Sequence, residues 1–183
     1  MDSLQDDQKK MASEIIPSKI SVIVFQRILQ VLLSESISIR DISGILEGIA
    51  EFVDITTNIR RLTEQVRLRL AKQICHANTS EKGYIPIVML SKSWEQEFSD
   101  FIHGKDEDSY QLVIPPSKLQ SFASDFNKIV DRFAFEGESV VLLTSAKVRP
   151  FIRSVVERIR PSVSVMSQNE IHTKAKIRIL GDM

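Results

Sequence analysis

The chain has 183 residues, of which 43% are apolar and 26% charged, an ordinary composition for one globular domain or two small ones. Its 24 basic and 24 acidic side chains cancel, which argues against a protein that coats nucleic acid, because such proteins carry a basic excess. No apolar run approaches the roughly 20 residues that span a bilayer, and the one cysteine, Cys75, excludes an internal disulfide. We therefore expect a soluble chain in a reducing, cytoplasmic compartment.

The first part of the chain predicts an all-helical subdomain over residues 15–82, preceded by a flexible segment over residues 1–14. Ser38, followed by Asp41 three residues later, is close to a capping box and marks the start of the second helix. Gly48 inside that helix costs about 1 kcal/mol relative to alanine, so close packing must compensate. Apolar residues recur at helical spacing in three stretches, residues 22–33, 39–53 and 58–76.

After the turn-rich residues 78–83 the pattern changes to strands alternating with helices, which predicts an α/β subdomain over residues 83–183. Phe122, Phe126 and Phe133 share one helix face and are expected to pack against residues 140–143. Pro150 means that the following helix either begins later than Ser145 or is kinked in its first turns. The predicted strands are residues 85–90, 112–114, 139–144, 163–166 and 175–180, and the predicted helices follow Ser93, Ser117 and Ser145.

The overall prediction is an α+β fold, in which a helical subdomain precedes a small α/β subdomain with a roughly four-stranded sheet and packed helices. Motifs for chemistry are not found in the sequence. The three histidines, His76, His103 and His172, have no cysteine or carboxylate at the spacing that a metal site needs. Residues 104–106 lack the upstream glycine and the hydroxyl residue of a phosphate-binding loop. We therefore predict no catalytic residue, metal or cofactor, and a protein that is not an enzyme.

A helix–turn–helix arrangement is a second interpretation of residues 22–53, and it would make the chain a small DNA-binding regulator. The helix that would enter the major groove exposes Glu47, Glu51 and two glycines, rather than the Arg, Asn or Gln that read bases. A plain helical bundle is the better interpretation, and we expect no nucleic-acid partner.

Charge is distributed unevenly in the second subdomain, and this suggests two surfaces for protein contacts. A basic group on one side of the last helix is predicted to comprise Arg149, Arg153 and Arg160, and an acidic group around a charged loop to comprise Asp100, Asp106, Glu107 and Asp108. A mixed, solvated surface would show the same residues. The alternative is a head-to-tail contact between copies. An acidic partner protein is a further candidate to bind the basic group.

Three stretches together resemble the FHIPEP family, the large export-gate subunits of flagellar and injectisome type III secretion. They are residues 38–47, with SIRDI followed by ILE; residues 140–160, a hydrophobic strand and an Arg-rich helix; and residues 165–181, with VMSQNEI followed by IRILG. The resemblance runs from about Ile15 to Met183. Trp94 and Phe98, followed by residues 112–115, favour the flagellar members. The chain departs from the family pattern at Gly44, Gly48 and His172.

The resemblance implies a non-enzymatic scaffold from the cytoplasmic half of a protein whose N-terminal half lies in the bacterial inner membrane. Family members assemble into a nonameric ring that docks chaperone–substrate complexes and the stalk of the export ATPase. The chain would then comprise only the last two cytoplasmic subdomains, and would meet the membrane only through the missing N-terminal half.

Overall fold

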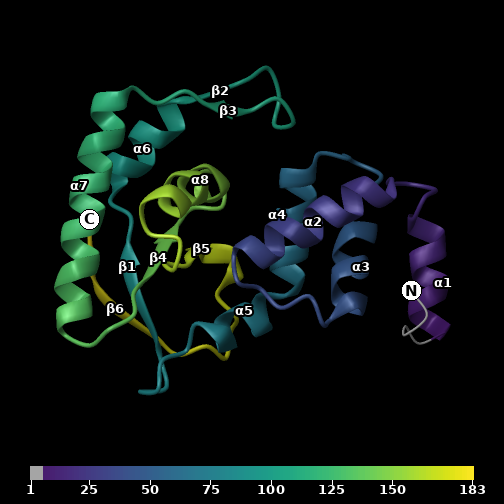
Figure 1. Ribbon diagram of the computed structural model, residues 1–183, viewed down its shortest axis with the longest axis horizontal. Helices are drawn as coiled ribbons and strands as arrows, with labels where there is room; N and C mark the ends of the chain where they lie inside the picture. Colours follow the sequence, from purple (N-terminus) through teal and green to yellow (C-terminus); the bar gives the residue numbers. More distant parts are fainter. Residues whose placement is uncertain (1–5) are drawn as a thin grey trace. The chain divides into compact units, whose positions relative to one another are not determined.

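The computed structural model describes residues 6–183, apart from the side chains of residues 6–8 and 11 (Figure 1). The chain divides into two compact units, one ending at Ile74 and the other running from Cys75 to Met183. Helices dominate the first unit, and the second combines helices with a parallel sheet, so the predicted α+β fold is confirmed. The predicted boundary between residues 82 and 83 lies inside the second unit.

The first unit consists of helices, and most of its apolar side chains at helical spacing are buried. Helix α3 packs against α4, α2 against α4, and α1 against α3. Helix α1 covers residues 6–14 of the segment that the sequence predicted to be flexible, and residues 1–5 lie outside the described part. The helices are α1 (Asp6–Ile15), α2 (Val22–Ser34), α3 (Ile42–Ala50) and α4 (Ile59–Arg69), and α5 (Ala71–Ala77) crosses into the second unit.

Two local predictions for this unit are wrong in detail. Helix α3 begins three residues later than predicted, because Asp41 rather than Ser38 is its N-cap and accepts a hydrogen bond from the Gly44 backbone N–H. The predicted third helix is broken at Leu70, which caps α4 in a non-helical conformation before α5 begins. Inside the unit, Arg67 and Glu35 form a buried ion pair at 2.6 Å between α4 and the end of α2.

The second unit is built on a four-stranded sheet in the order β5–β4–β1–β6, in which all pairs are parallel. A separate antiparallel pair, β2 and β3, forms a short hairpin. The strands are β1 (Ile85–Met89), β2 (Ile102–His103), β3 (Gln111–Leu112), β4 (Val141–Thr144), β5 (Val165–Ser167) and β6 (Ile177–Asp182). The helices are α6 (Lys92–Asp100), α7 (Pro116–Phe135) and α8 (Arg149–Ile159), with a 3-10 turn, η1, at Gln168–Glu170.

One face of this sheet carries the core of the second unit, formed with α6, α7 and α8. Phe122, Phe126 and Phe133 of α7 are buried there together with Leu142 of β4, as predicted. Phe98 of α6 lies edge-on to Phe122, with ring centroids 5.0 Å apart, which is a favoured aromatic geometry. Helix α8 begins at Arg149, so Pro150 falls in its first turn, where the missing N–H has no cost.

Candidate interaction surfaces

The basic group predicted on α8 is largely not a surface. Arg149 is only 1% exposed and Arg153 only 5% exposed. Both lie in line with Ile152 and Val156 on the buried face of α8, because residues three and four apart share one face of a helix. The prediction of an exposed basic face is therefore wrong for these two arginines.

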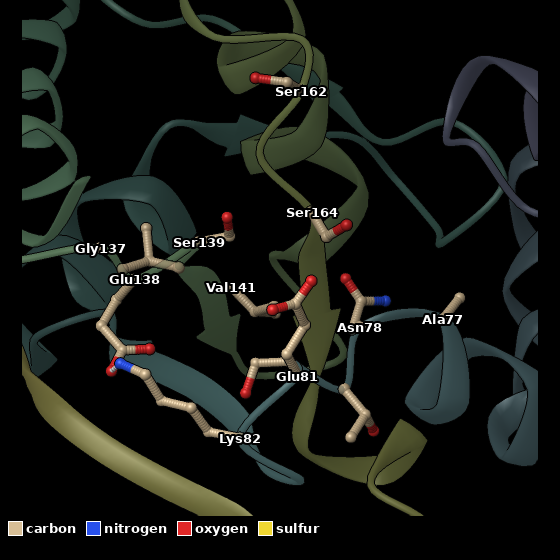
Figure 2. A pocket seen from close by; sticks show the side chains of 13 residues that line it. Ala77, Asn78, Glu81, Lys82, Gly137, Glu138, Ser139, Val141, Ser162 and Ser164 are labelled. Atoms are coloured by element: carbon tan, nitrogen blue, oxygen red, sulfur yellow. Dashed lines mark hydrogen bonds and ion pairs between the residues drawn. The ribbon is translucent and has the colours of Figure 1, made fainter.

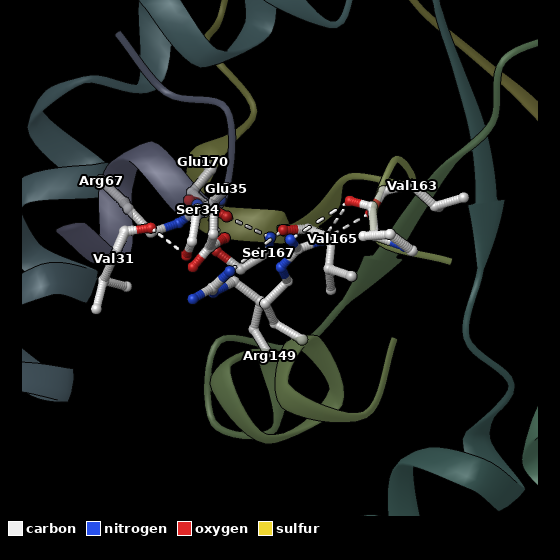
Figure 3. Close-up of polar contacts among 11 residues, drawn as sticks. Val31, Ser34, Glu35, Arg67, Arg149, Val163, Val165, Ser167 and Glu170 are labelled. Atoms are coloured by element: carbon white, nitrogen blue, oxygen red, sulfur yellow. Dashed lines mark hydrogen bonds and ion pairs between the residues drawn. The ribbon is translucent and has the colours of Figure 1, made fainter. Parts of the chain in front are cut away.

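Hydrogen bonds to backbone carbonyls explain how two guanidinium groups can be buried. Arg149 donates from Nη1 to the carbonyl oxygen of Val165 at 3.3 Å (Figure 3). Arg153 donates from Nη1 to the carbonyl oxygens of Val163, at 3.0 Å, and Pro161, at 3.4 Å. A guanidinium has five N–H donors, so it can hold an irregular segment in place before an edge strand. These arginines fix the segment that leads into β5.

Arg160 differs from the other two because it is only half-buried at the C-cap of α8. Its Nε donates to Asn127 Oδ1 at 2.8 Å, and its Nη2 lies 2.6 Å from Asp131 Oδ1. Both partners belong to α7, so Arg160 joins the end of one helix to the middle of the other. Its visible role is within the unit.

The acidic group is exposed, as a surface for contacts requires. Asp100 ends α6 and accepts a hydrogen bond from Gln96. Asp106, Glu107 and Asp108 form the tip of the β2–β3 hairpin, where Asp106 Oδ1 accepts from the Ser109 backbone N–H at 2.9 Å. The structure thus brings three of the four predicted acids together on one turn and places Asp100 on the adjoining helix. Their contact with any partner remains a prediction.

A polar cavity of about 440 Å³ lies at the amino ends of β1, β4 and β5 (Figure 2). Lys82 Nζ lies 2.5 Å from Glu138 Oε1, and the Tyr84 hydroxyl donates to the same oxygen at 2.7 Å. Sequence reasoning missed this cluster, because Lys82 and Glu138 are far apart in the chain and belong to no motif. Its walls include Asn78, Thr79, Ser80, Glu81, Ser139, Ser162 and Ser164.

The charges of this cluster favour a structural pair over proton transfer. Hydrogen bonds from Lys82 and Tyr84 lower the pKa of Glu138, and the bond to Glu138 raises the pKa of Lys82. Both groups therefore stay ionised across the neutral range, which is the opposite of what a general acid or base needs. Ligands in open α/β sheets bind at the carboxyl ends of the strands, whereas this cavity lies at their amino ends.

Glu95 of α6 is a well-bonded acid at the carboxyl end of β4. Its Oε1 accepts hydrogen bonds from the Thr144 hydroxyl and the Ser145 backbone N–H, and its Oε2 accepts from the Ser145 hydroxyl, each at 2.6 Å. Glu95 therefore ties α6 to the end of β4.

Cys75 is buried, and burial raises the pKa of its thiol, which makes it a poor nucleophile. Its Sγ donates to the carbonyl of Glu170 at 3.2 Å and accepts from the His172 backbone N–H at 3.3 Å. Among the residues that the structure describes, no three His, Cys, Asp or Glu side chains are grouped to hold a metal ion. None of the described helices is both long and apolar enough to cross a membrane.

The sequence of the chain is similar to those of known proteins. Residues 1–176 match the FHIPEP family. The chain belongs to that family. It is 46% identical over 97% of its length to the flagellar biosynthesis protein FlhA of Caulobacter vibrioides, and 29% identical over 99% to FlhA of Bacillus subtilis. It spans 25% and 27% of these two relatives, about a quarter of their length.

Solved structures with the same fold belong to type III secretion proteins. The cytosolic domain of EscV, solved as a nonamer, superposes with a TM-score of 0.81 over 99% of this chain and 53% of its own, at 23% identity. CdsV of Chlamydia pneumoniae, solved in complex with CdsO, gives a TM-score of 0.76 over 96% of this chain and 50% of its own, at 27% identity. The predicted resemblance to the flagellar export-gate family is confirmed.

Proposed function

We propose that this chain is a non-enzymatic docking and ring scaffold of a flagellar type III export gate. The observation that carries the proposal is its 46% identity to an FlhA protein across 97% of the chain. Identity at this level over nearly the whole chain supports the same fold and a related role. In this proposal the chain is the last part of the cytoplasmic half of a longer protein, whose other half lies in the inner membrane.

Further support comes from the fold relatives and from the surfaces themselves. A nonameric ring is the solved state of the EscV cytosolic domain, and a second copy of this chain is therefore the first partner that we propose. The CdsV complex with CdsO shows that a relative binds another protein. For this chain we propose the stalk of the export ATPase and chaperone–substrate complexes as further partners. The bonded acids described above fit this role, since each stabilises a junction between elements.

No observation favours the DNA-binding interpretation. The helix that would read bases is α3, and Glu47 on it is ion-paired with Arg69 of α4. The residues buried on α3 face the other helices of the bundle.

A chimera tests the proposed function. The C-terminal segment of Caulobacter vibrioides FlhA that aligns with this chain would be replaced by residues 1–183, in cells lacking their own FlhA. Swimming in soft agar and secretion of flagellin into the medium are measured. We expect the chimera to restore both, at least in part, because the two segments are 46% identical and the proposal gives them the same role.

A matched control carries Phe126→Ala in the chimera, which should destabilise the second unit by about 3–5 kcal/mol and reduce export. A chimera that is produced and inserted normally, yet neither assembles nor exports, would overturn the proposal. Filter binding to DNA at low and physiological salt tests the alternative, because a DNA binder loses affinity steeply as salt rises.

A further inference from the structure

Strand β6 presents a bare edge with apolar side chains. It is the last strand of its sheet, so only one of its edges pairs, with β1, and no strand lies on the other edge in the described part of the chain. Ile177 is 44% exposed and Ile179 58% exposed, and both point to the same face because side chains alternate along a strand. Their cross-strand neighbours Ile85 and Ile87 are fully buried. An exposed apolar edge is a template for an added strand.

Cations flank this edge. Lys174 and Lys176 both lie just before β6, and within the described residues their side chains make no ion pair or hydrogen bond. Arg178 already has a partner within the unit, because it donates to the Tyr84 hydroxyl at 3.0 Å and lies over the Tyr84 ring. Edge lysines discourage indiscriminate strand pairing, and the same charges select a partner strand that carries acids.

The second surface is the β2–β3 hairpin, residues 102–112. Its two strands pair only through Ile102 with Leu112 and His103 with Gln111, so each has an outer edge without a strand beside it among the described residues. Val113 at its base is 60% exposed. A two-stranded hairpin is marginally stable by itself, and adding it to a larger sheet would stabilise it. Its tip carries the acids Asp106, Glu107 and Asp108, of which Lys105 offsets one.

We propose that the β2–β3 hairpin of one copy adds to the β6 edge of the next copy. The tip acids would face Lys174 and Lys176, and Val113 would cover Ile177 and Ile179. The hairpin extends from the end of the unit where α6 and α7 meet, and β6 lies at another margin, beside β1 (Figure 1). Two different surfaces at different margins give a head-to-tail contact, which is the kind that closes a ring.

This inference rests on the proposed ring scaffold and names its contact. It also replaces the basic side predicted from the sequence, because Arg149 and Arg153 are buried and Arg160 is paired within the unit. Exposed charge pairs contribute only ~0–1 kcal/mol each. The contact is therefore weak in the isolated chain and gains from the high local concentration of an assembled ring.

Cysteine crosslinking in the FlhA chimera tests the contact. The variant carries Glu107→Cys with Lys176→Cys, both exposed, and mild oxidation is followed by non-reducing electrophoresis. We expect a ladder of crosslinked copies that reductant removes and that neither single variant gives. The matched control pairs Lys176→Cys with Ser124→Cys on the exposed side of α7, and should give no ladder.

Charge reversal provides an independent measurement. For this measurement the crosslinked pair is Glu107→Cys with Ile177→Cys. Adding Lys174→Glu and Lys176→Glu should reduce the yield of this crosslink roughly tenfold. Adding Asp108→Lys as well should restore part of the yield. Normal export without the ladder would overturn the contact and leave the proposed function standing, whereas a chimera without export would count against the function. If the single variant Lys176→Cys formed a crosslink between two copies, or with a different protein, the β6 edge would bind that partner instead of the hairpin, and the proposed contact would be overturned.

Discussion

Gly48 lies where α3 approaches α4 most closely, and replacing it with alanine tests whether this approach holds the helical unit together. A Cβ at position 48 would lie 2.9 Å from the Val66 Cα, 3.3 Å from the Val66 N and 3.4 Å from the Arg69 Cβ. The first two atoms are backbone and cannot turn aside, so the helices must separate by about half an ångström or more. Neighbouring core residues Ile45, Ile49 and Leu62 would lose contact.

Two opposing terms give the magnitude for Gly48→Ala. Alanine gains about 1 kcal/mol of helix propensity over glycine. Overpacking against rigid backbone costs about 1–3 kcal/mol, to which the opened contacts between α3 and α4 add. We expect a net loss of about 1–2 kcal/mol in the free energy of unfolding, measured by urea denaturation of the chain followed by circular dichroism.

Gly44→Ala on the same helix is the matched control. Its Cβ would meet only the Asp41 carboxylate, which is exposed and free to turn into solvent. The loss of that N-cap, about 1 kcal/mol, roughly cancels the gain in propensity, so the stability should change little. If Gly48→Ala proved as stable as the wild-type chain, the close approach of α3 and α4 would not be what Gly48 provides.

Four further measurements check other parts of the structure. Phe126→Ala should lower the free energy of unfolding by about 3–5 kcal/mol, while Phe135→Ala, at a side chain 95% exposed, should change it little; equal effects would contradict the packing of α7. Arg153→Glu should destabilise the second unit by about 3 kcal/mol or more, because a carboxylate would face the carbonyls of Pro161 and Val163, whereas Arg158→Glu on the exposed face should be near neutral. The lowered pKa of Glu138 stabilises the fold above the unfolded carboxyl pKa, and this contribution is lost as pH falls through the folded pKa; Glu138→Gln should therefore make unfolding less dependent on pH in the acid range, with Glu157→Gln as the exposed control. Limited proteolysis should cut first at residues 78–84 or 104–109, and first cuts within residues 39–53 would contradict the proposed division of the chain.

The periodicity of apolar residues was sufficient to predict most of the fold. The helix expected at residues 22–33 runs from Val22 to Ser34, and the strand expected at residues 85–90 runs from Ile85 to Met89. The break at Leu70 could not be predicted, because no glycine or proline marks it and the apolar spacing continues into α5. Helix ends depend on which side chain reaches a free backbone N–H, and both Ser38 and Asp41 were suitable candidates.

The candidate sites were harder to predict than the fold, because charge in a sequence does not reveal burial. Arg149 and Arg153 have the spacing of an exposed stripe and equally the spacing of the core residues beside them. Only the carbonyls at Pro161, Val163 and Val165, which come after the helix, decide between these alternatives. The exposure of the hairpin acids could be predicted from the sequence, because three consecutive charged residues in a loop are too costly to bury. The edge of β6 escaped notice, since IRILG looks like a buried strand until its place in the sheet order is known.

Three acids at strand ends, Glu138 and Glu170, which are buried, and Glu95, which is half-buried, show how this fold uses its carboxylates. Glu95 holds the end of β4 to α6, and Glu138 is held by Lys82 and Tyr84 before β4. Glu170 accepts from the Ser167 backbone N–H at 2.5 Å and closes the turn after β5. Each carboxylate is therefore committed to the backbone or to a fixed partner at a strand end, where it makes the sheet rigid. A rigid sheet keeps its two margins at a constant separation, and a subunit that meets a neighbour on each side needs that property for a ring to close.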